Sequence, residues 1–363
     1  MQRRKFWGWG LEGEGPSAEQ AAGIAATLAA RFGTALAAPL PAPRIENVAL
    51  RAPRVQPPRA LAALCTEEPA ERAGHAYGKS YRDIVRAFRG EFPNPPDQVA
   101  RPRTESDVEA LLEWCAEAGI AAIPYGGGSS VVGGVEPDVG DGYAGAVSID
   151  LGRLDRVLEI DRASRSARIQ AGVLGPALED QLRPHGLTLR HFPQSFEFSS
   201  LGGWIVTRSG GHYATLYTHI DDFVQGLRVV TPTGVVETRR LPGSGAGPAP
   251  ERLFIGSEGT LGIVTEAWMR LQDRPTRRAG ASVRFGGADG FLRGARAVRA
   301  LSQAALYPTN CRLLDAAEAQ NSGAAAGDAA VLVLGFESAD HDLDPWIARA
   351  LECCADAGGE VPE

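Results

Sequence analysis

The sequence predicts a mixed α+β protein with more than one domain, and three observations support this. The chain has 363 residues, which is enough for two domains of about 150 residues each. Helical and strand-like patterns follow one another from residue 104 onward. The pattern changes after Pro275, where a shorter strand–helix arrangement begins. We place the domain limits at residues 1–95 (an N-terminal arm and linker), 96–273 and 274–363.

The composition is typical of a soluble globular protein, with 44% apolar and 22% charged residues. The 37 Lys and Arg against 44 Asp and Glu give a net charge of −7, which argues against nucleic-acid binding driven by overall charge. Lys5 and Lys79 are the only lysines, so most lysine-nucleophile chemistry is excluded. The five cysteines are odd in number and form no Cys-x-x-Cys pair, which predicts free thiols rather than disulfides or a Cys-rich metal site.

No stretch of 18 apolar residues occurs, so we predict no transmembrane helix. Arg3-Arg4-Lys5-Phe6 resembles the start of a twin-arginine export signal, but Glu12, Glu14 and Glu19 follow instead of an apolar segment. We therefore expect a cytoplasmic protein.

The N-terminal arm is expected to contain one helix. An Ala-rich stretch favours this helix near residues 18–32, because Ala is the strongest helix former. Six prolines between Pro39 and Pro58 then exclude regular helix and predict an extended linker. The segment Pro93–Pro102 predicts a second proline-rich joint.

Residues 104–273 predict alternating helices and strands. Thr104 and Asp107 have capping-box spacing, and the apolar spacing after them predicts a helix that Gly119 ends. A second helix is expected between Pro176 and Gly186, and a third is expected to carry Trp204. Strands are expected at residues 120–123, 145–150, 156–160, 166–171, 226–231, 234–239 and 262–271.

Residues 274–363 predict a smaller α+β domain. Its strands are expected at residues 281–285, 311–314 and 331–337, and its helices at 288–302 and 346–357. This β-α-β-β-α order is a ferredoxin-like unit without its final strand. The chain stops at Val361-Pro362-Glu363, where that strand would begin, so we expect a C-terminally incomplete chain.

A glycine-rich loop follows the strand expected at residues 120–123. Consecutive glycines allow successive backbone N–H groups to turn toward one anion, and two serines add hydroxyl donors. The loop does not match a Rossmann fingerprint, since Val131 stands at its last glycine position. Gly78-Lys79-Ser80 does not complete a P-loop, because Gly74 is one residue too close to it. The alternative is a glycine-rich surface turn. The residues of this candidate anion site are Pro124, Tyr125, Gly126, Gly127, Gly128, Ser129 and Ser130.

Two further runs of unusual residues lie downstream, at His191–Trp204 and Gly256–Gly262. Ser199 or Ser200 is expected to cap the helix that carries Trp204. One such cluster is compatible with a simple turn, whereas three in one domain suggest an extended anionic ligand that is contacted at several points.

Together these runs resemble the PCMH-type FAD-binding domain of the vanillyl-alcohol-oxidase family, in its alkyldihydroxyacetonephosphate synthase branch. The branch is marked by P-x-G-G-G-[ST]-S, by H-x-P-x-S-x-E-F-[ST]-x-x-G-G-W followed by T-R, and by G-S-E-G-T-L-G-[IV]-[IV]-T-E. The chain matches these patterns at Pro124–Ser130, at His191–Trp204 with Thr207-Arg208, and at Gly256–Glu266. Phe6-Trp7-Gly8-Trp9-Gly10 also resembles the branch's W-x-G-W-G opening.

The resemblance implies a PCMH-type two-subdomain FAD-binding domain followed by a partial ferredoxin-like cap. It implies FAD held without a covalent bond, and no histidine lies in the Gly126–Ser130 loop to form one. The glycine-rich loop would hold the pyrophosphate. The residues implied to line the flavin are Gln194, Ser195, Phe196, Glu197, Phe198, Ser199, Ser200, Thr207, Arg208, Ser209 and Gly210. Those implied to pack against the dinucleotide are Glu258, Gly259, Thr260, Leu261, Gly262, Ile263 and Val264.

The resemblance also implies two catalytic residues, Arg312 and His191. Arg312 matches a family arginine needed for activity and suits a phosphate or carboxylate group; the alternative is a solvated strand-edge arginine paired with Asp315. For His191 the alternative is a hydrogen-bonded structural histidine. His212 and His219 are expected near the flavin edge. No metal site is predicted, and the family's proton-transfer Tyr and His-rich segment have no match.

Three hypotheses on function remain. The first is a synthase-like enzyme that uses flavin adduct chemistry to exchange the acyl group of acyl-dihydroxyacetone phosphate for a long-chain alcohol, in ether lipid synthesis. The second is an FAD-dependent D-2-hydroxyacid (lactate or glycolate) dehydrogenase or oxidase, and the third is an inactive, truncated flavin-binding module. The substrate would be a small molecule or a lipid phosphate, with peripheral membrane contact and a homodimer as further expectations.

Overall fold

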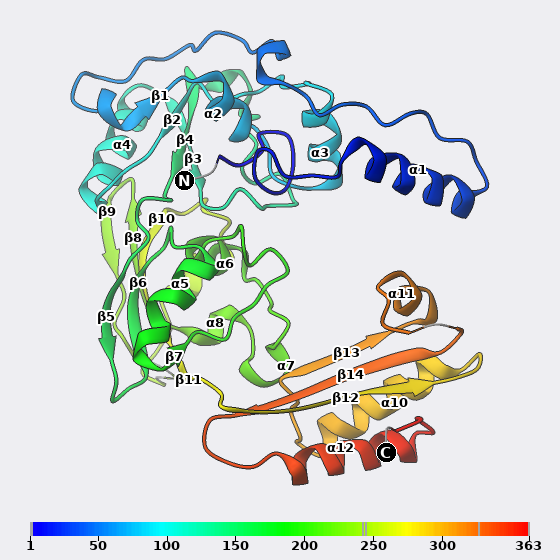
Figure 1. The fold of residues 1–363 in the computed structure, drawn as a ribbon. Helices are drawn as coiled ribbons and strands as arrows, with labels where there is room; N and C mark the ends of the chain where they lie inside the picture. Colours follow the sequence, from blue (N-terminus) through cyan, green and yellow to red (C-terminus); the bar gives the residue numbers. More distant parts are fainter. Residues whose placement is uncertain (1–2, 242, 244, 326, 362–363) are drawn as a thin grey trace. The chain divides into compact units, whose positions relative to one another are not determined.

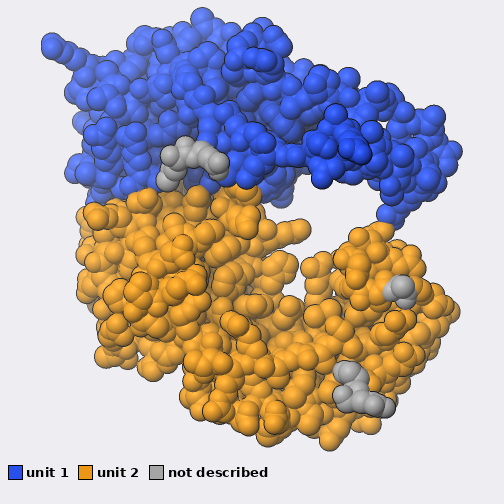
Figure 2. Space-filling model, viewed as in Figure 1, with its two compact units in different colours: residues 1–154, 230–235 blue, residues 155–229, 236–363 orange. Residues whose placement is uncertain are grey.

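A computed structural model describes residues 3–241, 243, 245–325 and 327–361 of the chain. It is a mixed helix-and-sheet protein, as predicted. The chain divides into two compact units (Figure 2). Unit 1 contains residues 1–154 and 230–235, and unit 2 contains residues 155–229 and 236–363. The three-domain limits expected above stay a prediction.

Unit 1 begins with an arm that packs on the body of the unit. Phe6 is buried in an apolar cluster with Tyr77 and Phe92, and the Trp7 ring contacts Phe88 edge-on at 5.1 Å. Helix α1 (Ala18–Phe32) follows, as predicted, with Ser17 as N-cap in a capping box with Gln20. None of the residues of α1, which is labelled in Figure 1, is buried.

The body of unit 1 is a four-stranded sheet with the order β1-β2-β4-β3. Its strands are β1 (Cys65–Thr66), β2 (Gln98–Ala100), β3 (Ile120–Tyr125) and β4 (Gly145–Asp150). Strands β2 and β3 run parallel to β4. Helix α4 (Glu105–Glu117) packs against β3, with Thr104 and Asp107 forming the predicted capping box.

The proline-rich interpretation of residues 93–102 is wrong in part. Strand β2 lies inside this segment and is buried along its whole length, because it pairs on both sides with β1 and β4. Helices α2 (Pro69–Gly74) and α3 (Tyr81–Phe88) were also not predicted. Both are short, and α2 begins at a proline.

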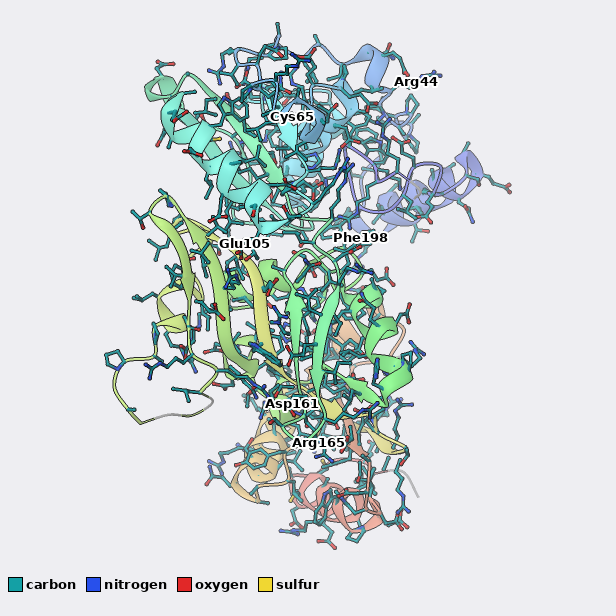
Figure 3. The ribbon with its side chains drawn as sticks, turned by 90° about the vertical axis from the view of Figure 1, so that its left-hand side faces the viewer. Arg44, Cys65, Glu105, Asp161, Arg165 and Phe198 are labelled. Atoms are coloured by element: carbon teal, nitrogen blue, oxygen red, sulfur yellow. The ribbon has the colours of Figure 1, made fainter. Side chains whose placement is uncertain are left out.

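A five-stranded sheet with the order β5-β6-β10-β8-β9 lies mainly in unit 2; the end of β8 and the start of β9, within residues 230–235, belong to unit 1. The strands are β5 (Val157–Asp161), β6 (Ser166–Gln170), β8 (Val224–Thr231), β9 (Gly234–Glu237) and β10 (Ile263–Arg270), close to the predicted ranges. In the turn between β5 and β6, the Asp161 carboxylate accepts a hydrogen bond from Ser164 N at 3.0 Å, and Arg165 has φ of 45° (Figure 3). The small sheet of β7 (Leu187–Thr188) and β11 (Gln272–Asp273) lies outside it.

The helices of this part of unit 2 pack mainly through α5 and α6. Leu178 and Leu182 of α5 (Gly175–Leu182), and Trp204 and Ile205 of α6 (Leu201–Thr207), are fully buried in one core with the sheet. The 3-10 helix η4 (Arg183–His185) extends α5, and Gly186 ends it in the left-handed region, as predicted. Short helices α7 (Ala214–Tyr217), α8 (Ile220–Phe223) and α9 (Glu251–Phe254) were not predicted.

The rest of unit 2, from residue 274 onward, is called the cap below. Its antiparallel sheet has the order β12-β14-β13, with β12 (Arg277–Phe285), β13 (Asn310–Leu314) and β14 (Ala330–Ser338). Helices α10 (Gly290–Gln303) and α12 (Asp344–Asp356) pack on the face that carries Val283 and Leu332 (Figure 1). Helix α11 (Ala316–Asn321) stands where a linker was expected.

A single bridge pairs Glu360 antiparallel with Arg284 of β12, next to the predicted position of a final strand. Pro362 and Glu363 lie outside the described residues. All five cysteines are free, as predicted. Burial raises the pKa of Cys65 to about 11 and is the main reason that the pKa of Cys115 lies at about 12, so both are protonated thiols at neutral pH.

Candidate cofactor site

The glycine-rich loop in unit 1 turns over the side chain of Tyr125, the last residue of β3. The Tyr125 hydroxyl donates a hydrogen bond to Gly74 O at 3.1 Å, which holds the ring in place. Gly128 has φ of +66°, and a Cβ atom there would lie 1.9 Å from Tyr125 Oη. Only glycine fits this position, because both the backbone conformation and the contact exclude a side chain.

The backbone polar groups of the loop are used unequally. Gly127 O accepts a hydrogen bond from Arg4 Nη1 at 2.8 Å, and Ser130 O accepts one from Lys79 N at 2.7 Å. In contrast, none of the five amides of residues 126–130 donates a hydrogen bond to any described residue. Successive amides without an internal acceptor form a nest for an anion, so the loop fits a pyrophosphate.

The second run, in unit 2, begins with a buried histidine. His191 is 2% exposed, and its Nε2 lies 2.9 Å from Ser209 Oγ. The ring contacts Trp204 and Phe223. Burial, with a smaller effect from His219, lowers the pKa of His191 to about 4. His191 is therefore neutral at pH 7 and orients Ser209, which supports the structural alternative.

The hydroxyls between Ser195 and Ser200 form internal hydrogen bonds. Ser199 Oγ donates to Ser195 O at 2.8 Å and accepts from Trp204 Nε1 at 2.6 Å. Ser200 caps α6 by accepting from Gly203 N at 3.3 Å, which confirms the expected cap. The Phe196 ring stacks on Trp204 at 6.1 Å, while Phe198 lies just before α6 (Figure 3). This run therefore builds a rigid support at the start of α6.

The third run meets the end of the same helix. Glu258 N donates to Val206 O at 2.9 Å, and Gly256 N donates to Ile205 O at 3.2 Å. Arg208, the C-cap of α6, has φ of 50°, and its guanidinium pairs with Asp221 at 3.0 Å. The structure thus brings together two of the predicted groups, 207–210 and 258–264, and α6 joins them to 194–200. Ile263 and Val264 are buried in β10, and the Ser257 hydroxyl is buried without a partner among the described residues.

Arg312 lies on β13 of the cap, on the sheet face opposite α10 and α12. Its side chain is 54% exposed and pairs with Glu318 at 2.8 Å. The alternative expectation that Arg312 pairs with Asp315 is therefore wrong. The Asp315 carboxylate instead caps α11 by accepting a hydrogen bond from Glu318 N at 2.8 Å. Helix α7 contacts β13, so the strand that carries Arg312 lies beside the segment that follows Gly210.

The comparison with protein families decides the cofactor. Residues 96–239 match a family described as FAD binding domain. These residues are an FAD-binding domain of that family. FAD is therefore the cofactor, and the loop with unpaired amides lies inside this domain.

Known relatives confirm the resemblance to the synthase branch. Alkyldihydroxyacetonephosphate synthase of Dictyostelium discoideum is 38% identical over 289 residues, 78% of this chain and 46% of the synthase. A solved structure of alkyldihydroxyacetonephosphate synthase has a TM-score of 0.80 at 32% identity, covering 89% of this chain and 65% of that chain. Glycolate oxidase subunit GlcD of Bacillus subtilis is 34% identical over 187 residues, 51% of this chain and 39% of that subunit. The chain thus spans about half the length of the curated synthases it matches.

Two cations beside the FAD-binding domain's loop were missed from the sequence. Lys79 and Arg4 both touch the loop through the contacts given above, although neither belongs to its motif. Only a weak signal in the sequence indicates that Lys79 belongs to the site. Lys79 is one of two lysines, and it lies in Gly78-Lys79-Ser80, which does not complete a P-loop.

The described part of the chain contains no helix that is both long and apolar enough to cross a membrane. No three or more of its His, Cys, Asp or Glu side chains are grouped in a way that would hold a metal ion.

Proposed function

We propose that this chain is the flavin-binding part of a synthase-like enzyme that exchanges the acyl group of acyl-dihydroxyacetone phosphate for a long-chain alcohol. One observation carries this choice. The similarity to the Dictyostelium synthase covers 78% of the chain, well beyond residues 96–239, whereas the similarity to the glycolate oxidase subunit covers 51%. The likeness to the synthase therefore extends outside the part that binds FAD.

The residues take separate roles in this proposal. Bound flavin supplies the electron sink of the reaction, and the protein supplies position and charge. The amides of residues 126–130 bind the pyrophosphate, and FAD is held without a covalent bond. Neutral His191 positions Ser209 rather than exchanging protons near pH 7, and the Arg312 guanidinium binds the substrate phosphate.

The test is the response of the flavin absorption bands to added substrate. The purified chain with FAD is mixed with acyl-dihydroxyacetone phosphate in one cell and with D-lactate or D-glycolate in another, without oxygen. Bleaching by the acyl phosphate alone supports the synthase proposal. Bleaching by the D-2-hydroxyacids alone supports the dehydrogenase hypothesis, and no bleaching by either supports a flavin-binding module without activity.

The role of Arg312 is tested by substitution. We expect Arg312→Ala to leave FAD bound and to weaken the binding of the acyl phosphate at least tenfold, because a charge-assisted contact is lost. Arg349→Ala is the matched control, since Arg349 is 52% exposed and also pairs with a glutamate at 2.8 Å. Equal substrate affinity in both variants would remove Arg312 from the site.

We also propose that the cap is ferredoxin-like. The strand order β12-β14-β13 and the bridge between Arg284 and Glu360 support this, because a fourth strand of such a unit pairs beside the first. A cytoplasmic location, a lipid-phosphate substrate met by peripheral membrane contact, and a homodimer belong to the same proposal. Size-exclusion chromatography with light scattering tests the last of these.

A further inference from the structure

We infer that Lys79 and Arg4 form a cationic second part of the pyrophosphate site, and that the N-terminal arm therefore belongs to the cofactor site. The inference rests on the assignment of the glycine-rich loop proposed above. All of the groups concerned lie in unit 1.

The position of Lys79 is set by the end of the loop. Its amide donates to Ser130 O at 2.7 Å, and a Cβ atom on the preceding Gly78 would lie 2.1 Å from the same carbonyl oxygen. The chain thus passes against the loop at a distance that only glycine allows at residue 78. This close approach fixes the backbone from which the Lys79 side chain leaves.

Among the described residues, the ammonium of Lys79 has no counter-ion. The side chain is partly buried, yet in the described ranges its ammonium makes no ion pair or hydrogen bond. Asp83, an acid that acts electrostatically on Lys79, is bound to other groups: its carboxylate accepts from Ser80 N at 3.1 Å and from Arg86 at 2.8 Å. A partly buried cation without a partner is costly unless an anion joins it.

Arg4 is brought to the loop by the arm. Phe6 is buried against α2 and α3, and Arg3 pairs with Glu68 and lies 3.5 Å from Glu71. These contacts anchor the chain on both sides of Arg4, whose Nη1 donates to Gly127 O at 2.8 Å. Packing of the arm therefore delivers a guanidinium to the middle of the glycine loop.

The two cations also act on each other. Burial, and then repulsion from Arg4, lower the pKa of Lys79 to about 8, against a smaller opposing effect of Asp83. The positive charges of Lys79 and Arg4 lie beside five backbone amides that have no acceptor among the described residues. Together these groups form a site that favours a negatively charged ligand. A dinucleotide pyrophosphate, which carries two negative charges at neutral pH, is the chemical class that neutralises it.

The test measures FAD and riboflavin binding to flavin-free protein by fluorescence quenching. Riboflavin lacks the pyrophosphate, so it reports on the flavin part alone. We expect Lys79→Met to weaken FAD binding at least tenfold and to leave riboflavin binding unchanged, while Lys79→Arg keeps the FAD affinity within about threefold. Lys5→Met, which changes the only other lysine, should leave both affinities unchanged.

The pH dependence separates a charge role from a structural one. The groups that face Lys79 are Arg4 from the arm and Asp83 from α3. Bound FAD favours the protonated ammonium, so the affinity of the wild type should be constant below about pH 8 and should fall as the pH rises above it. Lys79→Arg should abolish this fall.

Arg4→Gln is expected to weaken FAD binding three- to tenfold. Its control is Arg44→Gln, the same change on an arginine of unit 1 that is 77% exposed and pairs with Glu46 at 3.3 Å. If wild type binds FAD but Lys79→Met lowers FAD and riboflavin affinity equally, or lowers neither, the inference is wrong while the loop assignment stands. If the wild type binds no FAD, the proposed function itself fails.

Discussion

Gly128 is the residue on which the shape of the cofactor loop depends most directly. A Cβ atom at this position would overlap Tyr125 Oη, and its φ of +66° is unfavourable for any other residue. The Tyr125 ring cannot move aside without losing the hydrogen bond from its hydroxyl to Gly74 O. The loop conformation and the strand that precedes it are therefore coupled through one side chain.

We expect Gly128→Ala to lower the free energy of unfolding by about 2 kcal/mol or more and to abolish FAD binding. Gly133→Ala is the matched control, because Gly133 has φ of +83° but no atom within 4 Å of a new Cβ. This variant should lower the free energy of unfolding by only about 1 kcal/mol, the cost of placing alanine in the left-handed backbone conformation, and it should retain FAD. Chemical denaturation and FAD titration measure both. Retention of FAD by Gly128→Ala would contradict the loop assignment.

His191 makes the stability of the protein depend on pH. Its folded-state pKa of about 4 lies below the ordinary value of 6.5, so between these pH values the unfolded chain binds a proton that the folded protein does not. The free energy of unfolding should therefore fall by about 1 kcal/mol per unit as the pH drops from 6.5 to 4. His191→Gln should remove this slope. His341→Gln, at a side chain that is 51% exposed, should leave it in place.

At the scale of elements, one carboxylate fastens the extended segment after α1 to the first sheet. Asp97 is completely buried and accepts hydrogen bonds from Arg54 N at 2.8 Å and from Ala146 N of β4 at 2.8 Å. The side chains of Arg51 and Arg54 also bind it. Burial alone would raise the pKa of Asp97, and these hydrogen bonds outweigh it, so the pKa lies well below its usual range.

We expect Asp97→Asn to destabilise unit 1 by about 3 kcal/mol at pH 7, because the charge of a completely buried acceptor is removed from its hydrogen bonds with two arginines and two backbone amides. The ionised carboxylate stabilises fully above about pH 4, and this contribution is lost as the pH falls through the lowered pKa. The difference from wild type should therefore shrink in acid. Asp273→Asn, whose carboxylate is 46% exposed and pairs with Arg165, should cost less than 1 kcal/mol. A similar loss in both variants would contradict this assignment.

Helix α6 shows how a short element organises several site residues. Its N-cap is Ser200, its C-cap is Arg208, and its last turn receives the amides of Gly256 and Glu258. The seven residues of α6 therefore bring together segments of two sequence motifs that lie about 50 positions apart in the chain. Periodicity could not have predicted this contact, since it depends on pairing between distant segments.

At the scale of the whole molecule, one ion pair connects the segment before His191 with the cap inside unit 2. Arg190 and Glu337 are 6% and 7% exposed and lie 2.5 Å apart. Arg190 adopts φ of 63° and also lies over the rings of Phe192 and Tyr213. Arg278 reaches the same carboxylate at 3.1 Å from the exposed side.

Arg190→Met should lower the free energy of unfolding by about 2 kcal/mol or more, because it leaves a buried carboxylate with only an exposed partner. Arg278→Met removes the other arginine from the same carboxylate and should cost less than 1 kcal/mol, since Arg278 is 68% exposed. Urea denaturation of both variants compares the two contributions. Equal losses would mean that burial does not distinguish the two arginines.

The sequence by itself determined the elements with strong local signals and the cofactor they serve. An Ala-rich stretch located α1, a capping box located α4 and alternation located β10. The glycine-rich loop predicted an anion site that the FAD-binding domain match supports. These signals are local, because caps, periodicity and glycine conformations act between residues that are close along the chain.

Only the tertiary structure decided the rest. Strand β2 exists within a proline-rich segment because two neighbouring strands pair with it, and His191 is neutral because other elements bury it. The partner of Arg312 is Glu318 because α11 occupies the carboxylate of Asp315. Arg4 meets the loop because the arm folds back on α2 and α3, and Lys79 meets it because the chain at Gly78 passes against Ser130. Each of these depends on burial or pairing between distant residues, which a single sequence does not contain.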